Sequence, residues 1–161
     1  MNSKRCLFLS QSDRRSNKKR DVLKMKKQMQ NMPIAVCAAV IEKDGKVLLT
    51  ERPADKRLGG FWEFPGGKID PGESPHQSLV RELKEELDIE IEVGHLLETV
   101  YHHYDWGNVL IIAYLCRWAG GEIKHLEVAD HAWLTPEQLS SCNILPADQP
   151  ILSKLLSRQK N

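Results

Sequence analysis

Apolar residues along this chain follow two different spacings, and the first spacing predicts strands. Apolar runs bounded by turn residues occur at Ile34 to Glu42, Lys46 to Glu51, Ile89 to His102, Asn108 to Trp118 and His131 to Leu134. Lys43-Asp44-Gly45 between the first two runs is typical of a hairpin turn. Gly59 to Phe64 leads into a glycine-rich loop, and a polar loop separates the two long strands.

The second spacing has a helical period. Ser74 is a suitable N-cap, Pro75 suits the first helical position, and Gln77 can complete a capping box. The buried stripe of this helix is predicted to consist of Leu79, Val80, Leu83 and Leu87. Pro136 to Leu139 and Gln149 to Arg158 are also predicted to be helical. Strands mixed with helices indicate an α/β fold.

Composition and charge divide the chain into two parts. With 161 residues, of which 41% are hydrophobic, the chain can bury one core, so residues 32–161 are predicted to form a single domain. Residues 1–31 hold ten Lys or Arg against two Asp, a net charge of +8, which leaves 13 basic against 20 acidic residues and a net of −7 for the remainder. The basic arm is expected to be disordered. It could bind nucleic acid through phosphates, but we favour a translation start at Met25 or Met32. The acidic body argues against tight DNA binding.

Several classes of protein are disfavoured by what the chain lacks. Cys6, Cys37, Cys116 and Cys142 show no CxxC spacing, so reduced thiols and a cytoplasmic location are expected. The six histidines show no ligand spacing, and a zinc site is not expected. No stretch approaches the roughly 20 apolar residues that cross a membrane.

Three carboxylates carry the chemistry of the predicted central helix. A helix turns about 100° per residue, so Glu82, Glu85 and Glu86 project from one face. On many helices such a run is only a solvated face. Here the repulsion among the three charges would be relieved by a hard divalent ion such as Mg²⁺ or Mn²⁺, which prefers oxygen ligands. The backbone carbonyl of Gly67, in the loop before the helix, could join these ligands.

The loop and helix together resemble one protein family. The pattern G-x5-E-x7-R-E-U-x-E-E-x-x-U, in which U is a bulky aliphatic residue, is the signature of the Nudix hydrolases and matches Gly67, Glu73, Arg81, Glu82, Leu83, Glu85, Glu86 and Ile89. The resemblance is strongest to the MutT-like branch and extends from about Pro33 to about Leu156. Asp88 departs from the pattern, which has a glycine there. Asp tolerates a left-handed backbone better than most residues, so we expect the fold to accept it.

The resemblance implies a fold, a cofactor and an active site. The fold would be an α/β/α sandwich with a mixed β-sheet, and the cofactor Mg²⁺ or Mn²⁺. Glu73 and Arg81 would pair to hold the loop on the helix. The catalytic residues would be Glu82, Glu85, Glu86, Arg81 and Glu127, and the metal ligands Gly67, Glu82, Glu85, Glu86 and Glu127.

Three residues outside the signature match substrate-binding positions of the MutT-like branch. Arg52 would contact the phosphates or the base, Phe64 would line the base pocket, and Asp148 would read the base edge. Each has a simpler interpretation or a second role, since Phe64 suits the core and Asp148 could cap the last helix. Trp106 is either a stacking platform for the base or a partly buried anchor.

The implied reaction is hydrolysis of a nucleoside triphosphate to the monophosphate and pyrophosphate. Sanitation of the nucleotide pool, as an 8-oxo-dGTP diphosphatase with a role in DNA repair, is the leading interpretation. Hydrolysis of CTP, dCTP or methylated pyrimidine nucleotides is the alternative, because an ionised Asp148 only accepts hydrogen bonds and the chain has no counterpart of the arginine that MutT places near the purine. A nucleotide sugar or dinucleotide substrate, or a non-catalytic sensor or base-reading module, are further alternatives. The preferred sugar and the oligomeric state are not indicated.

Overall fold

The computed structural model describes residues 18–25 and 32–158. The chain divides into two compact units, Met1–Met32 and Pro33–Asn161. In the first unit, residues 18–25 form a helix with exposed side chains, whereas the sequence predicted disorder throughout the arm. Most of these residues are Lys, Arg, Leu or Met, which have high helix propensity. The rest of the predicted disorder lies outside the described residues, and the role of the arm remains a prediction.

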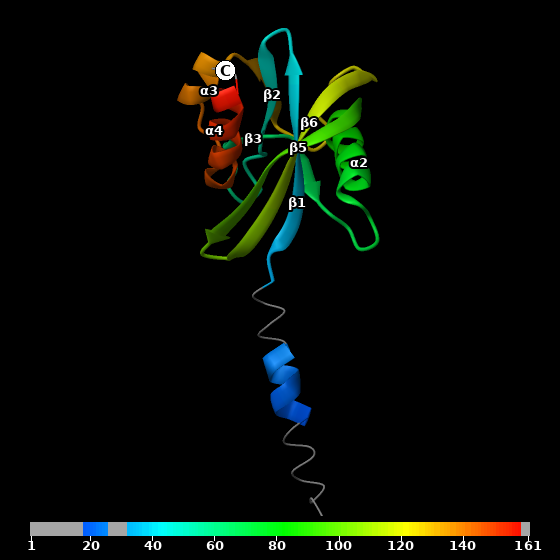
Figure 1. Ribbon diagram of the computed structural model, residues 1–161, viewed down its shortest axis with the longest axis vertical. Helices are drawn as coiled ribbons and strands as arrows, with labels where there is room; N and C mark the ends of the chain where they lie inside the picture. The colour runs from blue at the N-terminus through cyan, green and yellow to red at the C-terminus, as the bar shows by residue number, and fades with distance from the viewer. Residues whose placement is uncertain (1–17, 26–31, 159–161) are drawn as a thin grey trace, which may run out of the picture. The chain divides into compact units, whose positions relative to one another are not determined.

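The second unit is built on a mixed sheet, to which the described residues contribute seven strands in the order β3-β2-β1-β6-β5, with β4 paired to β1 and β7 to β2 (Figure 1). β1 runs parallel to β6 and antiparallel to β2 and β4. The strands are β1 (Ile34–Lys43), β2 (Lys46–Glu51), β3 (Trp62–Glu63), β4 (Gly66–Lys68), β5 (Ile89–Tyr104), β6 (Gly107–Gly121) and β7 (Asp130–Leu134).

Helices cover both faces of this sheet. In Figure 1, α2 (Pro75–Leu87) lies on one side, and α3 (Pro136–Ser141) and α4 (Gln149–Arg158) lie on the other. A short 3-10 helix, η1 (Pro146–Asp148), leads directly into α4. This arrangement confirms the predicted α/β/α sandwich with a mixed sheet.

The central strand β1 is buried on both faces because successive side chains point in opposite directions. Cys37, Ala39 and Ile41 pack with α2, where the buried leucines are Leu79, Leu83 and Leu87. Ala38 and Val40 pack on the opposite face with α3 and α4, which contribute Leu139, Ile151, Leu152 and Leu155. Two cores, one on each side of the sheet, therefore hold the layers together.

The buried face of α2 differs from the prediction at one position. Val80 is 45% exposed, although the sequence analysis assigned it to the buried stripe. Ser78 is fully buried instead, and its hydroxyl donates a hydrogen bond to the carbonyl of Lys68 at 3.0 Å. The helix thus faces the polar backbone of β4 as well as the apolar sheet.

Both hairpins turn within two residues. Asp44 and Gly45 have positive φ values of 51° and 72°, as a type I′ turn between β1 and β2 requires. The predicted polar loop between the long strands is a turn of Asp105 and Trp106, so β5 and β6 pair up to Tyr104 and Gly107. β4 was predicted as loop, and β3 spans only two residues of the predicted segment.

Two further expectations can be compared with the described residues. Cys37, Cys116 and Cys142 are free thiols, and Cys6 lies outside the described part of the chain. Among the helices described, none combines the length and the apolar character that a membrane span needs.

Candidate functional site

The loop before α2 and the start of that helix form as the sequence predicts. The Ser74 hydroxyl accepts the backbone N–H of Gln77 at 3.2 Å, and the Gln77 side chain accepts the backbone N–H of Ser74 at 2.9 Å. This capping box and Pro75 set the first turn of α2. The three carboxylates of Glu82, Glu85 and Glu86 then follow within one helical turn.

Two of these carboxylates lie against the glycines of β4. The backbone N–H of Gly66 donates to Oε2 of Glu86 at 3.3 Å. A Cβ atom at Gly67 would lie 2.3 Å from the carboxyl carbon of Glu82, so only glycine leaves room for this side chain. Glu82 and Glu86 therefore converge on the strand whose Gly67 carbonyl was predicted as a ligand.

Arg81 links the loop to the helix. Its guanidinium binds Glu73 through two hydrogen bonds, of 2.8 and 2.9 Å, which is the pair that the family resemblance implies. The same guanidinium donates to Glu82 and to Glu85, each at 3.0 Å. These hydrogen bonds, that to Glu73 first, raise the pKa of Arg81 and lower that of Glu73. Arg81 thus stays charged and orients two of the three helix carboxylates.

Burial and negative neighbours dominate the electrostatics of Glu86. Desolvation, followed by the charges of Glu63 and Glu82, raises its pKa to about 8. Burial also raises the pKa of Glu82, although Arg81 opposes the shift. Carboxylates in such surroundings are stabilised in the ionised form by a nearby cation.

Glu127 comes close to this group from a different part of the chain. Its side chain is exposed, but its backbone N–H and that of Leu126 donate to the backbone carbonyl of Glu86 at 3.4 and 3.0 Å. The charge of Glu127 also contributes to the raised pKa of Glu86. The structure therefore places the segment that carries Glu127 beside the end of α2, while the carboxylate of Glu85 is bound to Arg81.

The chemistry of this group fits a hard divalent cation. Every candidate ligand atom is a carboxylate or carbonyl oxygen, which Mg²⁺ and Mn²⁺ prefer. Burial, followed by the charges of Glu63 and Glu82, raises the pKa of Glu86, and a cation bound beside its carboxylate would favour the ionised form.

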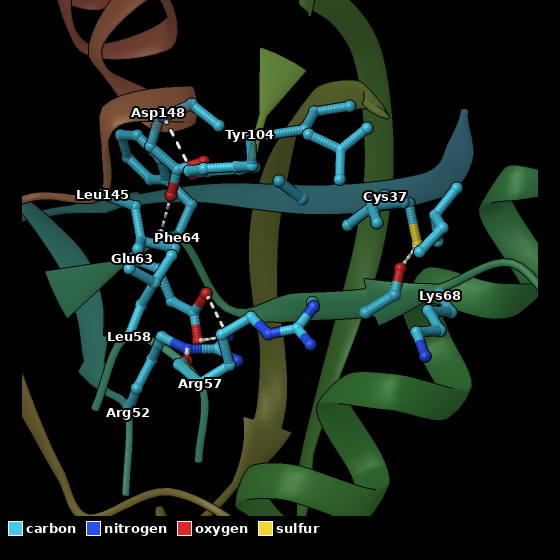
Figure 2. A pocket seen from close by; sticks show the side chains of 18 of the residues that line it. Cys37, Arg52, Arg57, Leu58, Glu63, Phe64, Lys68, Tyr104, Leu145 and Asp148 are labelled. Atoms are coloured by element: carbon cyan, nitrogen blue, oxygen red, sulfur yellow. Dashed lines mark hydrogen bonds and ion pairs between the residues drawn. The ribbon is translucent and has the colours of Figure 1, made fainter. Parts of the chain in front are cut away.

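A pocket of about 540 Å³ begins at these residues and extends across the sheet. Gly66, Gly67, Lys68 and Glu86 line one part of it, and the predicted substrate residues Arg52, Phe64 and Asp148 line another. Figure 2 shows Asp148 close to Phe64, with Arg52 and Glu63 below them and Lys68 on the far side of the pocket. One cavity thus joins Glu86 and the glycines of β4 to all three predicted substrate residues, whereas Glu82, Glu85 and Glu127 do not line it.

Asp148 is a buried acid in the wall of this pocket. Its side chain accepts the backbone N–H of Phe64 at 3.0 Å, and the residue is only 4% exposed. Burial, followed by the charge of Glu63, raises its pKa to about 8. The Asp148 carboxyl therefore binds the backbone of Phe64, next to β3. The simpler interpretation from the sequence was that it caps the last helix.

Arg52 is held by a partner that the sequence analysis did not identify. Its guanidinium donates to both carboxylate oxygens of Glu63 at 2.7 Å, and its Nε donates to the carbonyl of Arg57 at 3.0 Å. Burial raises the pKa of Glu63 even though Arg52 opposes the shift. Because Glu63 lies on β3, next to Phe64, the pair holds Arg52 beside the predicted base pocket.

Tyr104, Trp106 and Arg57 form a further group in the pocket, of which the sequence analysis considered only Trp106. The ring of Trp106 stacks on that of Tyr104, with centroids 4.9 Å apart, and the guanidinium of Arg57 lies 4.3 Å from the centre of the Trp106 ring. The Tyr104 hydroxyl accepts the backbone N–H of Ala147 at 3.3 Å, next to Asp148. Trp106 is 40% exposed and was recognised only as an alternative. No sequence motif connects Arg57 to this hairpin.

Comparisons with known proteins agree with this geometry. Residues 31–158 match the NUDIX domain family. The chain is 39% identical over 124 residues to a CTP pyrophosphohydrolase of Escherichia coli strain K12, which covers 77% of this chain and 92% of that protein. It is 31% identical over 127 residues to an 8-oxo-dGTP diphosphatase of the same organism, which covers 79% of this chain and 98% of that protein.

A solved structure shows the same likeness in three dimensions. The MutT NUDIX hydrolase from Burkholderia pseudomallei superposes with a TM-score of 0.69 at 27% identity, covering 77% of this chain and 98% of its own. The sandwich fold is therefore shared with this structure. The chain belongs to the Nudix hydrolases, enzymes that cleave phosphoric anhydride bonds, and within them to the MutT-like branch.

Proposed function

We propose that this protein is an Mg²⁺-dependent nucleoside triphosphate pyrophosphohydrolase that releases a nucleoside monophosphate and pyrophosphate. The observation that carries the proposal is that one pocket is lined by Glu86 and the β4 glycines on one side and by Phe64 and Asp148 on the other. A nucleotide has a matching division, with a polyphosphate that needs a cation and a flat base that needs an apolar wall and a few polar groups.

The acidic cluster would hold the ion through Glu82, Glu85 and Glu86, with the Gly67 carbonyl and Glu127 as further ligands. The bound ion would acidify water and neutralise phosphate charge. Arg81 orients Glu82 and Glu85 through its hydrogen bonds. Lys68 lines the same part of the pocket and is a cationic contact for a phosphate oxygen.

Asp148 supplies the selectivity for the base. With a pKa of about 8, its carboxyl is mostly neutral at pH 7 and both donates and accepts a hydrogen bond. Such a pair matches cytosine, whose ring N3 accepts and whose exocyclic amino group donates. The CTP pyrophosphohydrolase relative supports this choice, and we therefore place cytosine nucleotides ahead of 8-oxo-dGTP, which the sequence analysis favoured.

8-oxo-dGTP is the second candidate because a specific contact favours it. The neutral Asp148 could donate to O6 and accept from the N7–H that oxidation creates. Arg57 also lines the pocket and is a donor for the added oxygen, which the sequence analysis did not identify. Relatives named 8-oxo-dGTP diphosphatase support this candidate.

A substrate screen would test the proposal. The purified protein with Mg²⁺ is assayed against normal, methylated and oxidised nucleoside triphosphates, with nucleotide sugars and dinucleotides alongside, and the products are separated by ion exchange. We expect equal amounts of monophosphate and pyrophosphate and the highest kcat/KM for a cytosine nucleotide. A preference for 8-oxo-dGTP would select the second candidate. Cleavage of nucleotide sugars alone would contradict the proposal.

Matched carboxamide variants would test the acidic cluster. We expect Glu82→Gln and Glu86→Gln each to lower turnover by several orders of magnitude while circular dichroism stays unchanged, because each removes a charged oxygen ligand. Glu92→Gln is the control, since Glu92 is an exposed residue of β5 paired with Arg117. Substrate binding without ion-dependent cleavage by the wild type would indicate a sensor instead of an enzyme.

A further inference from the structure

Two histidines and an aspartate meet on the surface of the second unit, although they show no ligand spacing in the sequence. Nε2 of His125 lies 2.7 Å from Nδ1 of His131 and 3.6 Å from Oδ1 of Asp130. The ligand atoms of these three residues all lie within 4.8 Å of one another. We call this group the His-Asp-His cluster.

Backbone hydrogen bonds fix the chain on both sides of the His-Asp-His cluster. Lys124 and Leu126, on either side of His125, donate their backbone N–H groups to the carbonyls of Leu87 and Glu86 at 2.9 and 3.0 Å. Asp130 and His131 begin β7 and pair in register with Glu51 and Thr50 of β2. The end of α2 and the sheet thus fix the two sides of the cluster independently.

The Asp130 carboxylate is also oriented locally. Its Oδ1 accepts the backbone N–H of His131 at 2.7 Å, which leaves further lone pairs for a ligand. The side chains of His125 and Asp130 are 38% and 57% exposed, so water can complete a coordination shell.

The spacing of these atoms suits one metal ion. Two ligand atoms that are each about 2.0 to 2.1 Å from a tetrahedral Zn²⁺ lie about 3.3 Å apart. Oδ1 of Asp130 lies 3.6 Å from Nε2 of His125, close to this value, and the two imidazole nitrogens, now 2.7 Å apart, need to separate by about 0.6 Å.

We propose that His125, Asp130 and His131 form a second metal site, selective for a late first-row ion such as Zn²⁺. Imidazole nitrogen suits Zn²⁺, Ni²⁺ and Cu²⁺, whereas the all-oxygen group on α2 and β4 suits Mg²⁺ or Mn²⁺. The two sites therefore take different ions and fill independently. The second site does not depend on the proposed reaction, and its test needs no enzyme assay.

Isothermal titration calorimetry with Zn²⁺ would test the site. The full chain is prepared without a polyhistidine tag and titrated in a millimolar excess of Mg²⁺, which occupies the carboxylate group. We expect one Zn²⁺ to bind in the micromolar range. His125→Ala and His131→Ala should each raise Kd by about 100-fold or more, because losing a ligand costs more than losing its supporting contact.

His103→Ala is the matched control. His103 is exposed on β5 and contacts the side chain of Asn108, so it lies outside the cluster. This variant should bind Zn²⁺ as the wild type does, and Zn²⁺ should raise the melting temperature of both but not of the His131→Ala protein. Equal Zn²⁺ affinity in all four proteins, or no binding to the wild type, would overturn the proposal. Circular dichroism without zinc verifies that every variant is folded.

Discussion

At the scale of single residues, Asp88 shows how a departure from the family signature is tolerated. It adopts φ 56° and ψ 33°, the left-handed conformation for which the signature uses glycine. Its carboxylate binds Lys84 of α2 at 2.5 Å and Lys124 at 2.7 Å. The hydrogen bond from Lys124, followed by that from Lys84, lowers the pKa of Asp88 to about 2. The ion pairs offset a backbone conformation that is costly for a residue with a Cβ atom.

Substitutions at Asp88 separate these two effects. Asp88→Ala loses both ion pairs and keeps the unfavourable backbone, so its melting temperature should be the lowest of the series. Asp88→Gly loses the ion pairs but relieves the backbone, and Asp88→Asn retains a side chain that tolerates the left-handed region. Thermal unfolding at pH 7 checks the order. An alanine variant as stable as the glycine variant would show that backbone strain is unimportant here.

Asp148 predicts a pH effect on substrate selection. Its pKa of about 8 means that the neutral form dominates at pH 7 and disappears as the pH rises above 8. The KM for a cytosine nucleotide should therefore increase between pH 7 and 9 in the wild type. Asp148→Asn retains one donor and one acceptor at every pH, so its KM should stay level. Dividing the KM of the wild type by that of Asp148→Asn at each pH removes the pH dependence that the two proteins share. A ratio that stays constant from pH 7 to 9 would contradict the role of Asp148 in base recognition.

At the scale of elements, the contact between β4 and α2 positions the acidic cluster. The strand lies close to β1 on one side and to α2 on the other because it contains Gly66 and Gly67. Gly66 has φ 150° and its missing side chain would lie 2.2 Å from the Cys37 carbonyl, whereas Gly67 faces Glu82. Gly67 of the signature and the preceding Gly66 thus serve the packing of β4 between β1 and α2.

Gly67→Ala would test this packing through activity. The new methyl group needs the space of the Glu82 carboxylate, so the side chain must move by about 1 Å or more. A displacement of that size can cost about 100-fold in rate. We expect kcat to decrease by about this factor, with the circular dichroism spectrum unchanged. Gly45→Ala is the control for lost stability away from the site, because the positive φ of Gly45 strains an alanine although its Cβ atom would meet nothing within 4 Å.

At the scale of the whole molecule, buried acids predict how stability depends on pH. Glu86 and Asp148 both have a pKa of about 8 in the folded chain, compared with values near 4 in an unfolded one. Between about pH 4 and 8 the folded state therefore holds more protons, so its free energy of unfolding should decrease as the pH rises through this range. Asp88 has a lowered pKa of about 2 and acts only below this window.

Urea unfolding of the metal-free protein at pH 5, 6.5 and 8 would measure this decrease. Glu86→Gln and Asp148→Asn should each make the pH dependence shallower and increase stability at pH 8, since each removes a buried carboxylate that must ionise. Glu92→Gln should follow the wild type. If the free energy of unfolding of the metal-free protein increased from pH 5 to pH 8, the raised pKa values of Glu86 and Asp148 would be contradicted.

The sequence alone determined the features that depend on neighbours along the chain. The capping box of α2, the helical spacing of its three carboxylates, the turn at Asp44-Gly45 and the boundaries of β2 all follow from local propensity and periodicity. The signature also identified the family, because its residues serve one local loop and helix. These features were predictable since each requires only a few consecutive residues to adopt a preferred conformation.

Only the tertiary structure decided which distant residues share a site. Asp148 meets Phe64 across 84 positions, and Arg57 reaches Trp106 from another loop. The pairing of His125 with His131 likewise depends on the end of α2 and on the register of β7. Such contacts, and the burial that raises the pKa of Glu86 and Asp148, arise from packing and strand register, which no local pattern specifies.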